Sequence, residues 1–171
     1  IILIATIVIT ITSLNIKLYA LSKNNNELTY KNLVGKNRFD TSILIAKEAY
    51  QNRANNVILV NGNNAIDGIP ATILANKLSA PILLTQPDSL SAELVKEIKE
   101  LKAKKVYLIG GTATISENVE KELDTMKISV ERIYGSTRYA TAIEVAKKVG
   151  GFKSVVICNS GNNGVNGATV L

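Results

Sequence analysis

The chain has 171 residues, a formal net charge of +6, 46% hydrophobic residues and only 5% aromatic residues. This composition is typical of a packed α/β protein and argues against disorder. The sequence contains no histidine and one cysteine, which excludes Ser-His-Asp and Cys-His catalytic arrangements, a zinc site with the usual ligands and an intrachain disulfide. The positive excess favours anionic partners, but the lysines are scattered along the sequence, and solvated helix faces have the same composition.

The first fourteen residues carry no charged side chain. A membrane-spanning helix needs about 20 apolar residues, so this segment is short for an anchor. It is typical of the apolar core of a secretory signal peptide, with cleavage expected after Ala20. We therefore expect an exported protein with a signal peptide over 1–20, truncated at its positively charged start, and a polar linker over 21–32. An uncleaved membrane anchor and a buried strand are the alternatives.

Beyond the linker, short apolar runs alternate with amphipathic stretches of helical spacing. In chain order they predict helix 41–50, strand 57–60, helix 66–78, strand 82–84, helix 92–101, strand 106–109, a helix from Ser116, and strand 155–158. This alternation is typical of a parallel sheet with helices on its faces. We expect Asp40 or Thr41 to cap the first helix and Pro70 to lie in the first turn of the second.

Two segments about one hundred residues apart match without a gap, VGKNRFDTSILIAK at 34–47 and YGSTRYATAIEVAK at 134–147. The match resumes after a one-residue deletion, where 62–64 pairs with 161–163. Self-similarity at a fixed period indicates tandem structural repeats. We therefore predict an α/β fold of Rossmann-like or flavodoxin-like repeats, the first over 33–131 and a truncated second over 132–171.

Gly110 and Gly111 follow a predicted strand and precede a helix, which is the position of a phosphate-binding loop. The surrounding sequence lacks the third glycine of the dinucleotide fingerprint and the Lys-Ser/Thr of a P-loop. A tight turn that needs positive φ explains both glycines. We therefore expect no nucleotide cofactor, although a Rossmann-type nucleotide site remains the weaker alternative.

The acidic side chains Asp40, Glu48 and Asp67 have no second carboxylate at a recurring spacing. Helix capping accounts for Asp40 and Asp67, and Cys158 lies in an apolar run where a buried strand residue is expected. The sequence therefore predicts no catalytic residue and no metal ligand set.

Arg38 and Arg138 recur at equivalent positions, each directly before an aromatic residue at the start of a helix. A guanidinium beside a helix N-terminus can bind carboxylates or phosphates. A structural ion pair that joins one repeat to the next explains the same recurrence. Both interpretations stay open.

The segments 35–41, 57–67, 80–85, 106–111 and 135–141 together resemble the cell wall binding repeat 2 family of Gram-positive surface proteins. The resemblance implies an exported protein with three tandem repeats around a pseudo-threefold axis. The third of these repeats is absent from this sequence. It also implies non-covalent anchoring to an anionic polysaccharide of the wall, rather than binding to nucleic acid or, after signal cleavage, to membrane. A separate domain supplies the individual activity in such proteins.

The family's Ile-Leu-Leu motif is tied to anchoring, and it corresponds here to Ile82, Leu83 and Leu84. The resemblance therefore predicts that these residues, with Arg38 and Arg138, serve polymer binding or anchoring. The family's usual Asp-Ala-Leu-Ser reads DGIP at 67–70, which weakens the case for a site at that helix start. The alternative function is the wall-targeting part of a cell wall hydrolase, an N-acetylmuramoyl-L-alanine amidase, with its catalytic domain beyond Leu171.

Overall fold

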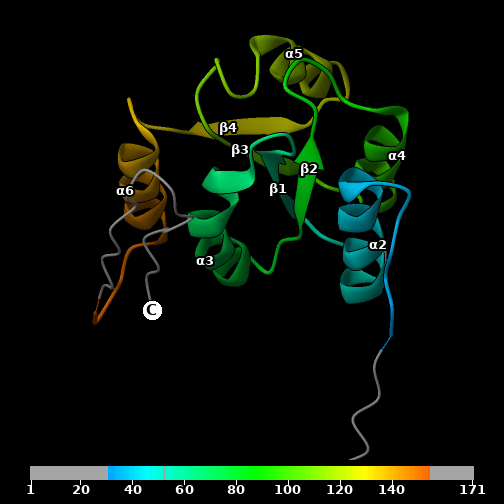
Figure 1. Cartoon of the computed structure of the whole chain (residues 1–171), viewed down its shortest axis with the longest axis horizontal. Coiled ribbons are helices and arrows are strands. Elements are labelled where there is room, and N and C mark those ends of the chain that lie inside the picture. The colour runs from blue at the N-terminus through cyan, green and yellow to red at the C-terminus, as the bar shows by residue number, and fades with distance from the viewer. Residues whose placement is uncertain (1–30, 52, 155–171) are drawn as a thin grey trace, which may run out of the picture. The chain divides into compact units, whose positions relative to one another are not determined.

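The computed structural model describes residues 31–51 and 53–154 of the chain (Figure 1). The predicted signal peptide over 1–20, nearly all of the linker and the predicted strand over 155–158 lie outside these residues. Among the helices that are described, none has the length and apolar character needed to cross a membrane.

The described fold is built on one parallel sheet. Its four strands are β1 (Asn56–Asn61), β2 (Ile82–Thr85), β3 (Lys105–Ile109) and β4 (Ser129–Ile133). They follow the spatial order β2-β1-β3-β4, which agrees with the flavodoxin-like order. The predicted α/β class is therefore confirmed, and β1, β2 and β3 lie where the apolar runs predicted them.

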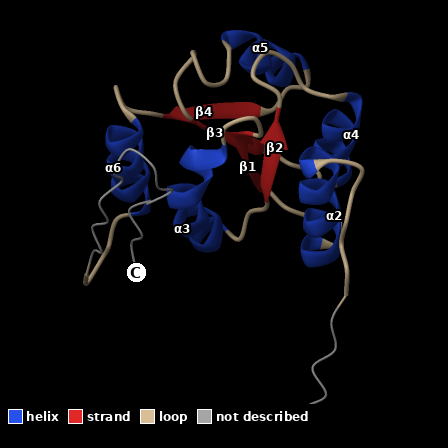
Figure 2. Ribbon diagram, viewed as in Figure 1, coloured by secondary structure: helices blue, strands red, loops and turns tan. Residues whose placement is uncertain are grey.

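Helices cover both faces of this sheet (Figure 2). They are α2 (Arg38–Tyr50), α3 (Gly68–Leu78), α4 (Ala92–Glu100), α5 (Glu117–Thr125) and α6 (Arg138–Val149), with a 3-10 turn η1 (Ala65–Asp67) before α3. One buried cluster joins α2, α4 and α5 to the sheet, and a second joins α3 and α6 to its opposite face.

The central strand β1 shows why both faces are covered. Val57 and Leu59 point into the first cluster, whereas Ile58 and Val60 point into the second. All four are essentially inaccessible to solvent. Side chains alternate between the two faces of a strand, so a continuous apolar run such as VILV requires apolar cover on both sides.

The helix starts differ from the prediction at two points. At α3, which begins at Gly68, Asp67 occupies the N-cap position but its side chain makes no capping hydrogen bond. Asn37, rather than Asp40 or Thr41, caps α2, because its side-chain oxygen accepts a hydrogen bond from the Asp40 N–H at 2.9 Å. The helix therefore begins three residues before the predicted start. Pro70 lies in the first turn of α3, as expected, where no intrahelical hydrogen bond is lost.

The turn after β3 confirms only half of the glycine prediction. Gly110 has a φ of +119°, a region that side chains with a Cβ rarely adopt, whereas Gly111 is not among the described residues with positive φ. A Cβ on Gly110 would also lie 3.1 Å from Asp67 Oδ2. This glycine thus allows the Asp67 carboxylate to lie against the turn.

The equivalent helices α2 and α6 bury different faces. Ile43 of α2 is 8% exposed, but its equivalent Ile143 of α6 is 56% exposed. Ile45 of α2 is 51% exposed, whereas Val145 of α6 is 1% exposed. The reason is that α2 packs on β2 and α4, while α6 packs chiefly on α3.

The Ile-Leu-Leu segment forms most of the edge strand β2. Leu83 is fully buried in the cluster beneath α2, α4 and α5, whereas Ile82 and Leu84 are half-buried on the opposite face. The Leu84 N–H donates a hydrogen bond to the Ser42 hydroxyl of α2 at 3.2 Å. The Leu83 side chain and the Leu84 N–H therefore hold the first helix against the sheet edge, whereas the side chains of Ile82 and Leu84 pack on the opposite face.

Replacing Leu83 with alanine should lower the free energy of unfolding by about 2–5 kcal/mol, because it leaves a cavity in the buried cluster. Leu84→Ala should cost less, because solvent already reaches part of that side chain. Urea denaturation of both variants measures the difference. An equal or larger loss for Leu84→Ala would contradict the burial described for this strand.

Candidate functional site

Both copies of the recurring segment start their helix in the same way. The Thr41 hydroxyl accepts a hydrogen bond from the Gly35 N–H at 3.0 Å, and the Thr141 hydroxyl accepts one from the Gly135 N–H at 3.1 Å. A Cβ on either glycine would lie 2.5 Å or 2.3 Å, respectively, from the Cβ five residues later. Only glycine fits there, so the sequence repeat is also a repeat of local structure.

Arg38 and the aromatic residue after it attach this helix start to the end of β1. Arg38 Nη1 donates a hydrogen bond to the Gly62 carbonyl at 2.9 Å. A Cβ on Gly62 would lie 2.2 Å from Phe39 Cε1, so the ring occupies the space that a side chain would need. The Gly62 N–H in turn donates to the Thr85 carbonyl at the end of β2. Arg38 thus has a structural role at the carboxyl edge of the sheet, although much of the residue remains exposed to solvent.

Arg138 lies at a polar pocket of about 290 Å³ at the same edge. Its lining comes from the ends of β1, β3 and β4 and from the start of α6, and it consists of Asn64, Ile66, Asp67, Gly111, Ala113, Thr114, Gly135, Ser136, Thr137, Arg138 and Thr141. Burial raises the pKa of Asp67, and the positive charge of Arg138 opposes that rise. The pocket therefore brings an acid of the first predicted repeat to an arginine of the second.

Asn61, the last residue of β1, holds one residue of the pocket lining in place. Its side-chain nitrogen donates to the Thr114 carbonyl at 2.7 Å, and its side-chain oxygen accepts from the Asn63 N–H at 2.8 Å. Sequence reasoning missed Asn61, although a polar residue that ends an apolar strand is a usable signal. Asn61 therefore fixes the position of Thr114, which lines the pocket together with Asp67 and Arg138.

Arg132 is a second residue that sequence reasoning missed. Its guanidinium donates to the Gly110 carbonyl at 2.8 Å and contacts Glu120 at 2.5 Å, so it braces the turn between β3 and α5. In the part of the chain that the structure describes, no three acidic, histidine or cysteine residues are grouped to hold a metal ion.

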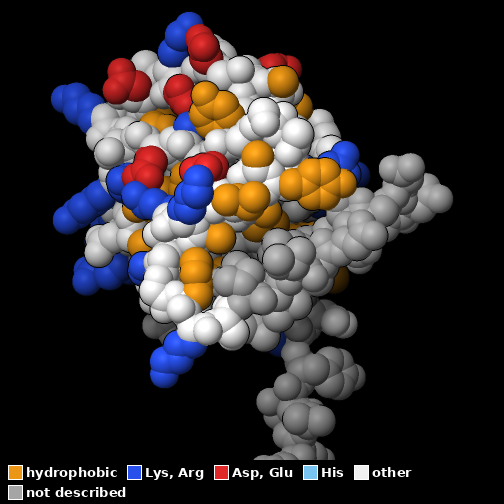
Figure 3. Space-filling view, turned by 90° about the vertical axis from the view of Figure 1, so that its left-hand side faces the viewer, with side chains coloured by type: hydrophobic (Ala, Val, Ile, Leu, Met, Phe, Trp, Pro, Cys, Tyr) orange, Lys and Arg blue, Asp and Glu red, His pale blue; other side chains and the backbone are white. Residues whose placement is uncertain are grey.

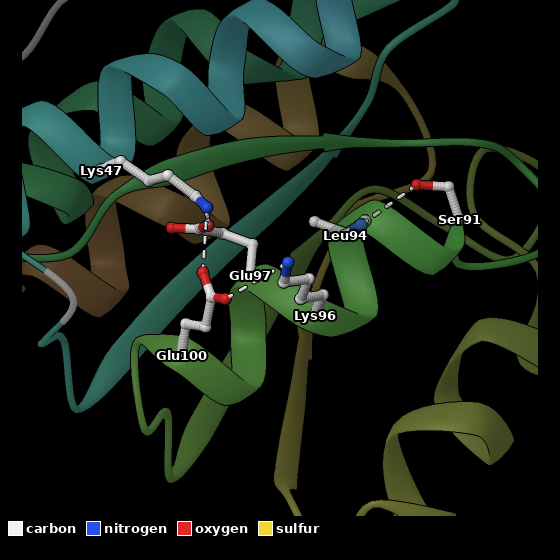
Figure 4. Close-up of polar contacts among 6 residues, drawn as sticks. All are labelled: Lys47, Ser91, Leu94, Lys96, Glu97 and Glu100. Carbon is white, nitrogen blue, oxygen red and sulfur yellow. Dashed lines mark hydrogen bonds and ion pairs between the residues drawn. The ribbon is translucent and has the colours of Figure 1, made fainter.

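A charged cluster lies beneath α2, where Lys47 meets two glutamates of α4 (Figure 4). Lys47 Nζ lies 2.9 Å from Glu100 Oε2 and 3.3 Å from Glu97 Oε2. Glu97 is 1% exposed. Its burial raises the pKa of its carboxyl group, while Lys47 opposes the rise. The hydrogen bond to Lys47 is the main cause that lowers the pKa of Glu100. This cluster ties α2 to α4 and is a structural element rather than a binding site.

The residues predicted to serve anchoring thus fall into separate places. Arg38 lies near the end of β2, the strand that contains Ile82, Leu83 and Leu84. Arg138 lies at the polar pocket, which those three residues do not line.

The chain belongs to the cell wall binding domain 2 (CWB2) family, whose model matches residues 32–120, just over half of its length. The family resemblance found in the sequence is therefore confirmed. Membership makes this a cell-wall-binding chain and indicates association with the cell wall or surface.

Relatives and solved structures agree with this assignment. The chain is 39% identical over 129 residues to the N-acetylmuramoyl-L-alanine amidase LytC of Bacillus subtilis (strain 168), covering 75% of this chain and 26% of LytC. It is 34% identical over 139 residues to the amidase enhancer of the same organism, covering 81% of this chain and 19% of that protein. The structure of Cwp8 from Clostridium difficile matches with a TM-score of 0.66 and 34% identity over 77% of this chain and 23% of Cwp8. Cwp6 from the same organism matches with a TM-score of 0.65 and 30% identity over 73% of this chain and 21% of Cwp6. The chain thus spans about a quarter or less of each relative.

The raised pKa of Glu97 sets the sign of a pH effect on stability. The Glu97 carboxyl group binds a proton more readily in the folded protein than in the unfolded chain. Its contribution to stability is therefore fully present below the unfolded pKa near 4.5. It is lost as the pH rises through the folded pKa. Because glutamine cannot ionise, Glu97→Gln should become progressively more stable relative to the wild type as the pH rises through this window. Urea denaturation across the pH range measures the trend.

Glu100→Gln is the matched control, because the pKa of Glu100 is lowered. Its stabilising contribution is present above the unfolded pKa and is lost as the pH falls through the folded pKa. The control should therefore show the opposite trend. Parallel trends in the two variants would contradict the assigned environments.

Proposed function

We propose that this chain attaches an exported surface protein non-covalently to an anionic polysaccharide of the bacterial cell wall. The observation that carries the proposal is the CWB2 match over residues 32–120. The net charge of +6 supports an anionic rather than a neutral polymer. In this proposal the predicted signal peptide over 1–20 directs secretion from a Gram-positive cell, and the chain itself performs no catalysis.

Two exposed arginines are our candidates for contact with the polymer. Arg38 and Arg138 both lie at the carboxyl edge of the sheet. A planar guanidinium can bind a carboxylate or phosphate group through two hydrogen bonds. For Ile82, Leu83 and Leu84 we propose an indirect role in anchoring, since their strand β2 is packed between the two buried clusters and hydrogen-bonded to α2.

The same proposal includes packing of successive repeats through the recurring helix. The face of α6 that contains Val145 is buried against α3, whereas the equivalent face of α2, which contains Ile45, is exposed. Val34, which shortly precedes α2 in the sequence, is also exposed, at 79%. We infer that the exposed face of α2 packs on the α3 side of a further repeat.

The outward face of α6 supports the same packing. Ile143 of α6 and Tyr134 in the loop before this helix are more than half exposed, and Figure 3 shows hydrophobic side chains at the surface on this side of the molecule. In α2 the position equivalent to Ile143 packs on its own sheet and α4. The remainder of the second repeat is our proposed cover for Ile143.

A second candidate function is the wall-targeting part of a cell wall hydrolase. The matches to an amidase and to an amidase enhancer favour it. In that case the catalytic domain lies elsewhere in the full protein, and the binding role proposed for this chain is unchanged.

Co-sedimentation with purified cell walls tests the proposed function. The full chain without its leader should bind intact walls and lose binding after extraction of the anionic polymer. Arg138→Gln should weaken binding by about two- to fivefold, because single exposed charge contacts contribute little. Lys121→Gln, which removes an exposed charge on α5, is the control and should leave binding unchanged. Equal binding before and after extraction would contradict the anionic partner.

A further inference from the structure

Three loops lie side by side at the amino edge of the sheet, opposite the edge that contains Arg38 and Arg138. The Ala54 N–H donates to the Leu101 carbonyl at 2.9 Å, which joins the loop before β1 to the loop before β3. The Lys104 N–H donates to the Asn55 carbonyl at 2.9 Å, and the Ser129 N–H donates to the Lys104 carbonyl at 3.1 Å. These bonds bring together residues 53–55, 101–105 and 127–129.

The three loops contain basic side chains and no acidic one. Arg53, Lys102, Lys104 and Lys127 are exposed, and we call these four residues the amino-edge rim. None of the four forms an ion pair with another residue that the structure describes. Lys105 is left out of the rim because Glu131 binds its ammonium group at 2.6 Å.

The charges of the rim contrast with those at the carboxyl edge. There Arg38 donates to a backbone carbonyl, and Arg138 interacts with the carboxylate of Asp67. Neighbouring strands lie about 4.8 Å apart, so loops before three neighbouring strands present the rim across roughly 10 Å. Several uncompensated cations over that distance favour a polymer with repeated negative charges over a single small anion, because many weak contacts act together.

Two rim lysines occupy strained backbone positions. Lys102 and Lys127 have φ values of 56° and 58° at the ends of α4 and α5, where glycine is the usual residue. A left-handed conformation strains a residue that carries a Cβ. Gln51 and Ser79 end α2 and α3 in the same conformation, so strain alone does not identify a site. It does provide a variant that removes charge while relieving strain.

We propose that the amino-edge rim is a second contact surface for the anionic wall polysaccharide, recognising phosphate or carboxylate groups along the polymer. This inference rests on the proposed function and adds a surface separate from Arg38 and Arg138. Because the rim is exposed, its contacts are screened by salt.

The test uses the double variant Lys102→Gly/Lys127→Gly in the full chain without its leader. Binding to intact walls should weaken by about three- to tenfold and depend less on salt concentration. The thermal midpoint should stay equal to that of the wild type or rise, because glycine removes the strain. Weaker binding together with a higher thermal midpoint would show that the variant has lost a contact with the polymer and that its fold is intact.

The control is Lys96→Gln/Lys121→Gln, which removes two exposed positive charges from the helices α4 and α5. It has the same net charge as the rim variant and should bind as the wild type does. If the rim variant binds as tightly as this control, the inference that the rim contacts the polymer is wrong, while the proposed function stands. If the wild type binds no better to intact walls than to extracted walls, both fail.

Three purified polymers identify the recognised group. A phosphodiester wall polymer and a uronic acid polymer distinguish phosphate from carboxylate, and the rim variant should bind the preferred one more weakly than the control does. Duplex DNA is the third probe. If the rim variant lost affinity for DNA but not for either wall polymer, the rim would be a nucleic-acid surface and the inference would be wrong.

Discussion

The architecture depends on a helix start that occurs twice with the same geometry. In each copy a glycine N–H donates to a threonine hydroxyl six residues later, and a Cβ on the glycine would collide with the helix. In the first copy Arg38 and Phe39 then attach the helix to Gly62, at the end of the most buried strand. Because neither the glycines nor Gly62 can accept a side chain, the position of the helix relative to the sheet is fixed.

The same helix serves two purposes because it has two apolar faces. In α2 the face containing Ile43 packs on its own sheet, and in α6 the face containing Val145 packs on α3. A helix of this kind can join each repeat to the one before it. Charged side chains fall into two groups. Glu97 and Arg132 interact with other residues within the fold, whereas the side chains of the amino-edge rim remain exposed to solvent.

Apolar patterning made most of the fold predictable, because strands such as β1 and β3 are buried on both faces and contain few polar residues. It failed for β4, where Glu131 and Arg132 interrupt the apolar run. The pocket was not predictable because Asp67, Thr114 and Arg138 meet only after folding. Lysines that are scattered in sequence gather at the amino edge for the same reason: the loops before parallel strands meet at one edge.

The proposed packing of repeats places the exposed face of α2 against a further repeat. Ile45→Cys, in a Cys158→Ser background, places a thiol on that face for alkylation. The cysteine should react quickly in this chain and at least tenfold more slowly in the complete repeat array of the full protein. Equal, rapid labelling in both would show that the face stays exposed and would contradict packing of repeats through the recurring helix.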